Sequence, residues 1–184
     1  MRMMVEMTDT NDPARERTTH VEPAHPPLSD AEDRIVVEAQ IGREPRAMEG
    51  VAARCCFGMP AVTRQAPTDS NGQPFPTAFY LTCPHLVKQI DRIEGVGGVR
   101  RYEQALRDEP ELHDATMAAH ARHRELTTHG ANIAASGNPE YPKCLHAHAA
   151  FELGAGDHPL GARVLDEAAP IWCEDARCRK FLAE

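Results

Sequence analysis

The chain has 184 residues, of which 41% are hydrophobic and 26% are charged, and its formal net charge is -8. This length suits one domain with a real hydrophobic core. The acidic balance argues against general nucleic-acid binding, which needs a basic face. No apolar run in the sequence approaches the roughly 20 residues that cross a bilayer, and the start lacks the apolar region of a secretory signal. We therefore expect a cytoplasmic protein without membrane insertion, whose six cysteines are thiols or metal ligands and not disulfides.

Three regions are expected along the chain. Residues 1–28 are predicted to form a disordered tail, because proline and charge are frequent there and large apolar side chains are scarce. A single domain is expected over 29–161. A C-terminal extension over 162–184 follows, and its last part could be helical.

The ordered part is predicted to begin with a helix over about 30–41. Ser29 and Glu32 have the spacing of a capping box, which marks a helix start. Gly42 can end the helix, since glycine adopts the left-handed conformation that a helix end requires.

The next region contains β-branched and aromatic residues separated by turn residues, which predicts an antiparallel meander. Three short strands are expected, over about 50–56, 60–66 and 76–82. Pro74 and Pro76 indicate that the third strand begins at an edge or a bulge.

Beyond Pro84 the apolar residues recur at helical spacing. Four helices are expected there: one that ends in the glycines of 95–98, a short one around 99–106, one from Pro110 to Gly130, and one from Pro142 to Gly154. The predicted fold class is α+β, with a small three-stranded antiparallel sheet covered by about four to five helices.

Three cysteines occupy positions that this fold would bring together. Cys55 ends the first strand and Cys83 ends the third. The two strands run in the same direction, so both cysteines lie at one edge of the sheet. Cys144 falls in the first turn of the last predicted helix, and that helix placed over the edge would unite three sulfurs. A histidine from the same helix would complete a tetrahedral Cys3His zinc site.

Two histidines compete for the fourth position. His148 shares a helix face with Cys144, whereas His146 is rotated from it by about 200° in a regular helix. His146 becomes a candidate if the chain is still irregular at Cys144. The candidate metal ligands are therefore Cys55, Cys83, Cys144, His146 and His148. Zinc is the expected ion, because it favours thiolate and imidazole ligands.

Other interpretations of the same residues stay open. Cysteine is commonly a small buried hydrophobic residue, so the thiols could be purely structural. Alternatively, Cys144 is a nucleophile with His146 or His148 as its base, which would make the protein a hydrolase or a transferase. An anion could also bind the free N–H groups at the start of the Cys144 helix, with help from Lys143 and from Arg54 or Arg64.

Two further groups of residues are not expected to form a metal or catalytic site. His120 and His123 could chelate at their spacing, but a solvated helix face is favoured for them. Cys173 and Cys178 are interpreted as incidental, or as a disulfide that forms only after oxidation.

Four stretches of the sequence together carry specific motifs: GREPRAMEGVAARCCFGMPAV, DSNGQPFPTAFYLTCP, RDEPEL and KCLHAH…GAGDHPLG. They resemble the actinobacterial family called domain of unknown function 501, over roughly residues 36–161. The resemblance includes His146 more clearly than His148 and accepts histidine at the Cys83 position, which favours a metal site because both residue types bind zinc. The family's gene neighbours (a septum-formation initiator, an exopolyphosphatase and enolase) imply an intracellular housekeeping role.

The expected function is binding or scaffolding, with a zinc site of mainly structural role. An enzyme that uses a pocket formed by Cys144, His146 and His148 is the alternative. An interaction protein linked to cell division is a weaker one, which rests on the gene neighbourhood of the resembling family.

Overall fold

The computed structural model describes residues 28–127 and 129–182. The predicted tail over 1–28 therefore lies outside the described residues, apart from Leu28. In chain order the elements are α1 (Asp30–Ile41), β1 (Met48–Arg54), β2 (Pro60–Gln65), β3 (Phe79–Leu81), α2 (Pro84–Gly95), α3 (Gly98–Asp108), α4 (Pro110–Leu126), η2 (Ile133–Ala135), α5 (Leu145–Ala155), α6 (Pro159–Glu167) and η3 (Arg177–Leu182). Among the helices of this described part, none is both long enough and apolar enough to cross a membrane.

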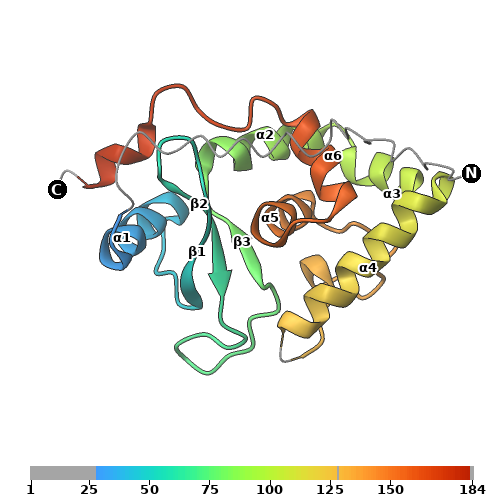
Figure 1. Ribbon diagram of the computed structural model, residues 1–184, viewed down its shortest axis with the longest axis horizontal. Helices are drawn as coiled ribbons and strands as arrows, with labels where there is room; N and C mark the ends of the chain where they lie inside the picture. Colours follow the sequence, from blue (N-terminus) through green and yellow to red (C-terminus); the bar gives the residue numbers. More distant parts are fainter. Residues whose placement is uncertain (1–27, 128, 183–184) are drawn as a thin grey trace, which may run out of the picture.

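The architecture is α+β, as predicted. The three strands form an antiparallel sheet in the order β1-β2-β3, with Val62 of β2 paired to Ala53 on one side and to Leu81 on the other. Helix α1 lies on one side of the sheet and α5 on the other, and α3, α4 and α6 lie beyond α5 (Figure 1). The third strand is shorter than predicted and starts only at Phe79, because the prolines that precede it cannot donate ladder hydrogen bonds.

Helix α1 has the predicted capping box. The Ser29 side chain accepts a hydrogen bond from the backbone N–H of Glu32, and the Glu32 carboxylate accepts one from the backbone N–H of Ser29 at 2.8 Å. Gly42 ends the helix with a φ of 68°, which glycine adopts at low cost.

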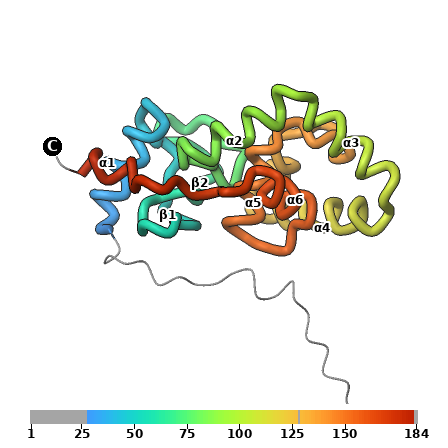
Figure 2. The backbone as a smooth tube through the Cα atoms, turned by 90° about the horizontal axis from the view of Figure 1, so that it is seen from above, coloured from blue at the N-terminus to red at the C-terminus, as the bar shows by residue number. Residues whose placement is uncertain are grey.

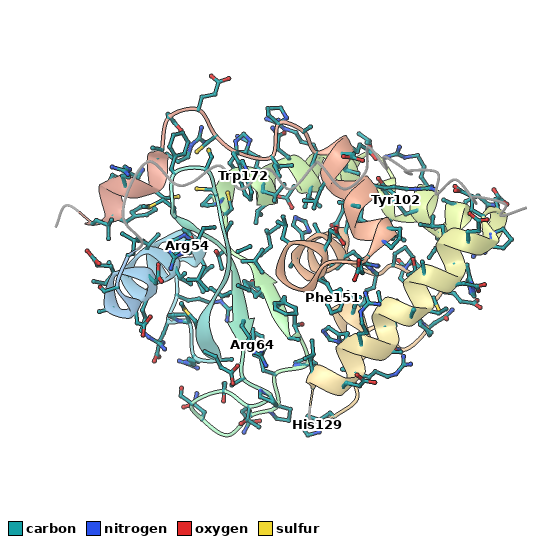
Figure 3. The ribbon with its side chains drawn as sticks, viewed as in Figure 1. Arg54, Arg64, Tyr102, His129, Phe151 and Trp172 are labelled. Carbon is teal, nitrogen blue, oxygen red and sulfur yellow. The ribbon has the colours of Figure 1, made fainter. Side chains whose placement is uncertain are left out.

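An ion pair holds α1 against the first strand. Arg54, at the end of β1, donates to both carboxylate oxygens of Asp33 in α1, at 2.7 and 2.6 Å. The Asp33 side chain is only 4% exposed, and Arg54 also donates to the Gly58 carbonyl at 3.1 Å. Figure 3 shows Arg54 between α1 and the strands. This two-pronged, partly buried geometry is the strong form of a salt bridge.

Helix α5 occupies the centre of the molecule (Figure 1) and contacts all three strands as well as α2, α6 and η2. Five of its eleven residues are buried, namely Leu145, His148, Ala149, Ala150 and Phe151. The prediction that this helix starts at Pro142 is wrong. Cys144 is the N-cap, with an extended backbone (φ -147°, ψ 113°), and the helix begins at Leu145.

His120 and His123 of α4 are buried, so the prediction that they form a solvated face is wrong. His120 and His123 are 0% and 1% exposed. Nδ1 of His120 accepts a hydrogen bond from the backbone N–H of Ile133 at 3.1 Å. Nε2 of His123 accepts one from the N–H of Ala78 at 3.2 Å. Each imidazole can be buried because it supplies the partner that a backbone group needs.

A second pair of buried histidines joins α5 to the start of α6. Nδ1 of His148 and Nε2 of His158 lie 2.7 Å apart, and the rings of His120 and His148 meet edge to face. Burial lowers the pKa of His120 to about 4 and that of His158 to about 3, and neighbouring charges add to the effect. These imidazoles are therefore neutral near pH 7.

Beyond α6, the C-terminal segment runs back across the molecule to α1, as Figure 2 shows. The segment is held on its way by a hydrogen bond of 2.9 Å between Nε2 of His85 and the Pro170 carbonyl. Its last part, η3, packs against α1. The last described element thereby lies beside the first described helix.

The close contact between α5 and α6 should make Gly161→Ala destabilising by about 1–3 kcal/mol, as is typical of overpacking. A Cβ at Gly161 would overlap the carbonyl oxygen of His148, which is backbone and cannot turn away. Urea unfolding measures the loss. Gly95→Ala is the matched helical control, because a Cβ there meets nothing within 4 Å. Equal stability of the two variants would contradict this packing.

The buried histidines should make the free energy of unfolding fall as the pH is lowered from 6.5 towards 4. In the unfolded chain His120 and His158 bind protons near pH 6.5, but in the folded protein their pKa values are about 4 and about 3. The unfolded state binds more protons in this window. The part of the free energy of unfolding that depends on these two histidines is therefore fully present above pH 6.5. It is lost below pH 6.5, by roughly 1 kcal/mol per pH unit for each histidine.

Urea unfolding between pH 7.5 and pH 4.5 measures this slope. His120→Asn should reduce it, whereas His113→Asn, at a residue with a partly exposed side chain, should leave it unchanged. The same slope in the wild type and in His120→Asn would count against the buried histidines as its source.

Candidate metal centre

One cluster of ligand-type side chains lies where the last turn of α2 meets the start of α5. It contains Glu94 from α2, Cys144 at the N-cap of α5 and His146 from the first turn of α5. One carboxylate oxygen, the sulfur and one ring nitrogen all lie within 4.8 Å of one another. The three side chains are partly exposed, so the cluster can be reached from solvent.

The imidazole of His146 is oriented by its far nitrogen. Nε2 lies 3.1 Å from the carbonyl oxygen of Val87. A carbonyl can only accept, so Nε2 carries a proton and Nδ1 is the nitrogen available to a metal. Nδ1 faces Cys144 Sγ at 3.7 Å and Glu94 Oε1 at 3.3 Å, and a metal would have to displace the proton that it carries near pH 7. Metal-binding histidines in proteins are held in this way, with the non-ligating N–H given to a carbonyl or a carboxylate.

The start of α5 orients the carboxylate. The backbone N–H of Leu145, the first residue of the helix, donates to Oε1 of Glu94 at 2.6 Å. The positive end of a helix dipole favours a carboxylate here. The sequence predicts that an external anion binds at this helix start. In the structure the carboxylate of Glu94, which belongs to the chain itself, lies there.

The two arginines expected to help bind that anion are engaged elsewhere. Arg54 pairs with Asp33 at 2.6 Å, and Arg64 pairs with Glu49 at 3.0 Å. The prediction of an anion site at the Cys144 helix thus stays without support from either arginine.

The electrostatics of the cluster favour positive charge. Burial on its own disfavours a charged imidazole. The hydrogen bond and charge of Cys144 and the carboxylate of Glu94 outweigh burial and raise the pKa of His146 to about 9. Asp91, with Oδ1 at 3.3 Å from Nε2 of His146, adds a further carboxylate on the outer side. A place that attracts a proton so strongly is also suited to a metal cation.

The five predicted ligands fall in three places. Cys144 and His146 are neighbours, as the irregular backbone at Cys144 allows. His148 points instead into the core, where it meets His158. The helix-face pairing of Cys144 with His148 does not form, because Cys144 is not part of the helix.

Cys55 and Cys83 do lie together, but not at this cluster. Both line a separate small cavity at the end of the sheet. Cys83 precedes α2 and Glu94 ends it, and a helical rise of about 1.5 Å per residue separates the two positions by roughly 16 Å.

Sequence reasoning missed Glu94 and Asp91. They belong to a helix that is distant in sequence from Cys144 (the contact between Leu145 and Glu94 spans 51 residues). No local spacing links them to the cysteine. The only available signal was the apolar stripe of α2, which fixes its inward face and thereby the side on which Glu94 lies.

The family described as "Protein of unknown function (DUF501)" matches residues 51–166 of the chain. Searches of curated proteins and of solved structures found no match. The matched region contains Cys55, Cys83, Glu94, Cys144 and His146, and it ends before Cys173 and Cys178. It covers more than half of the chain and agrees with the motifs quoted above. The chain therefore belongs to the DUF501 family.

Proposed function

We propose that the protein binds one zinc ion at Glu94, Cys144 and His146. The observation that carries the proposal is the position of Nδ1 of His146, which faces a sulfur and a carboxylate while Nε2 is held by the Val87 carbonyl. Three protein ligands leave one position of a tetrahedral ion for water or for a group of another molecule.

The donor types favour zinc over the common hard cations. Calcium and magnesium are bound by oxygen ligands, whereas this cluster offers one thiol, one imidazole and one carboxylate. Zinc accepts all three. A divalent ion would also offset the negative charge that Glu94 and a Cys144 thiolate bring to the same place.

The position between two helices supports a structural role, and the open fourth position would also let the ion bind a group of another molecule. The ion would join the end of α2 to the start of α5, the central helix of the fold. A binding or scaffolding protein needs α5 fixed at its N-terminus, because the residues before it form an irregular stretch without regular backbone pairing.

Elemental analysis of the purified protein tests the proposal. Cys144→Ser and His146→Asn should each lower the zinc content by one ion per chain and should lower the melting temperature by several degrees. Cys56→Ser is the control, as a partly exposed thiol outside the cluster. Undiminished zinc in both cluster variants would refute this site.

The same residues support a second candidate, a cysteine-dependent enzyme. Cys144 Sγ lies 3.7 Å from Nδ1 of His146, and Nε2 of His146 lies 3.3 Å from a carboxylate oxygen of Asp91. Nucleophile, base and orienting acid thus stand in order, with the thiol at a helix N-terminus, where reactive cysteines are often found.

Alkylation of the metal-free protein tests this second candidate. If Cys144 is a nucleophile, iodoacetamide should modify it near pH 7 at least tenfold faster than it modifies free cysteine. Asp91→Asn should slow the reaction, because the imidazole loses its acidic partner, and Cys144→Ser gives the background of the other thiols. A rate no faster than that of free cysteine rules the nucleophile out.

A further inference from the structure

Four cysteines from three distant parts of the chain converge on one small cavity at the end of the sheet. Cys55 follows β1, Cys83 precedes α2, Cys173 lies in the C-terminal segment and Cys178 lies in η3. Figure 3 shows sulfur atoms gathered where the C-terminal segment passes the ends of the strands. The cavity has a volume of about 10 Å³.

The four thiols line the same cavity, and all four residues are free cysteines. Burial, and to a smaller extent the nearby Cys178 and Cys55, raise the pKa of Cys83 to about 11. Burial also raises the pKa values of Cys55 and Cys178, and Cys173 adds to both effects.

Three of the sulfurs lie near N–H groups that favour a thiolate. The backbone N–H groups of Phe57 and Met59 act in this way on the pKa of Cys55, and those of His85 and Leu86 act on that of Cys83, in each case against the larger effect of burial. Such groups stabilise negative sulfur once it has formed.

The third sulfur, that of Cys178, receives a side-chain donor. Nε2 of Gln40 donates to it at 3.4 Å and also holds the Pro60 carbonyl at 2.8 Å. Arg177 and Lys180 lie near enough to favour its thiolate. Such outer partners are typical of metal-bound thiolates.

We propose that Cys55, Cys83, Cys173 and Cys178 are a second metal site, which takes a single zinc ion in tetrahedral tetrathiolate coordination. Binding breaks the S–H bonds and forms four Zn–S bonds, and the protons pass to the solvent. The resulting net charge of two negative units on the site is offset in part by the cations of η3. The site is separate from the Glu94 cluster and does not depend on it.

The small size of the cavity favours one ion over an iron–sulfur cluster. About 10 Å³ is close to the space for a single small species, whereas a cluster adds several iron and sulfide atoms. Of these four described cysteines, no three have sulfurs that all lie within 4.8 Å of one another. A zinc ion, with Zn–S bonds of about 2.3 Å, would draw them to about 3.8 Å apart. The C-terminal segment, which is not part of a regular helix or strand near Cys173, can make that adjustment.

Cobalt substitution tests the tetrathiolate site directly. The metal-free protein, kept reduced and titrated with Co²⁺, should show the visible bands of tetrahedral cobalt and a strong near-ultraviolet thiolate-to-cobalt band. That near-ultraviolet intensity grows with the number of thiolates. Cys173→Ser should remove most of it, whereas Cys144→Ser, which touches only the Glu94 cluster, should leave most of it. The same near-ultraviolet intensity in Cys173→Ser as in the wild type would overturn the proposal.

Zinc content supplies the second measurement. Cys173→Ser and Cys178→Ser should each lose one zinc ion per chain while keeping the ion at Glu94, and Cys56→Ser should lose none. Cys173 is partly exposed and outside the regular elements, so its variant is expected to fold even where substitution of buried Cys83 is not tolerated. Iron with acid-labile sulfide in anaerobically purified protein, or a disulfide among these four in freshly reduced and trapped protein, would overturn the single-ion assignment.

Discussion

Helix α5 is packed against the sheet on one side and against helices on the other, and this burial constrains most of the rest of the molecule. Because elements pack against α5 on several sides, small residues are needed where their backbones come close to it. Gly154 of α5 lies against the ring of Phe79 in β3, and Gly161 of α6 lies against the α5 backbone. Phe151 fills the remaining space towards α4 (Figure 3). Polar side chains on such a helix must be uncharged and must find partners within the core, which explains why His148 faces His158 and not solvent.

The candidate chemistry lies at the start of α5. This part of the helix is next to α2 and partly exposed, and there Cys144 and His146 meet Glu94 of α2. The two candidate metal centres therefore differ in character. The first combines three donor types and is open to solvent, which suits exchange with other ligands. The second consists of sulfur alone and lies between the sheet end and the C-terminal segment, which suits a permanent link.

The sequence allowed prediction wherever the cause was local. The capping box of Ser29 and Glu32 marked α1, the turn residues separated the strands, and the common direction of β1 and β3 brought Cys55 and Cys83 to one end of the sheet. The features that could not be predicted depend on contacts between residues that are far apart in the sequence. Pro142 predicted the start of a helix. The helix begins instead at Leu145, whose backbone N–H donates to the distant Glu94. His120 and His123 had the spacing of an exposed chelating pair, and only the backbone groups of η2 and of the stretch before β3 make their burial favourable.

The C-terminal segment returns across the molecule to lie beside α1, and this has a consequence for the order in which a growing chain matures. Synthesis proceeds from the N-terminus, so Cys55 and Cys83 emerge together with the sheet, long before Cys173 and Cys178 are made. Until then the nascent sheet carries only two of the four thiols that line the cavity. The proposed tetrathiolate site can therefore form only after η3 has been made and has packed against α1.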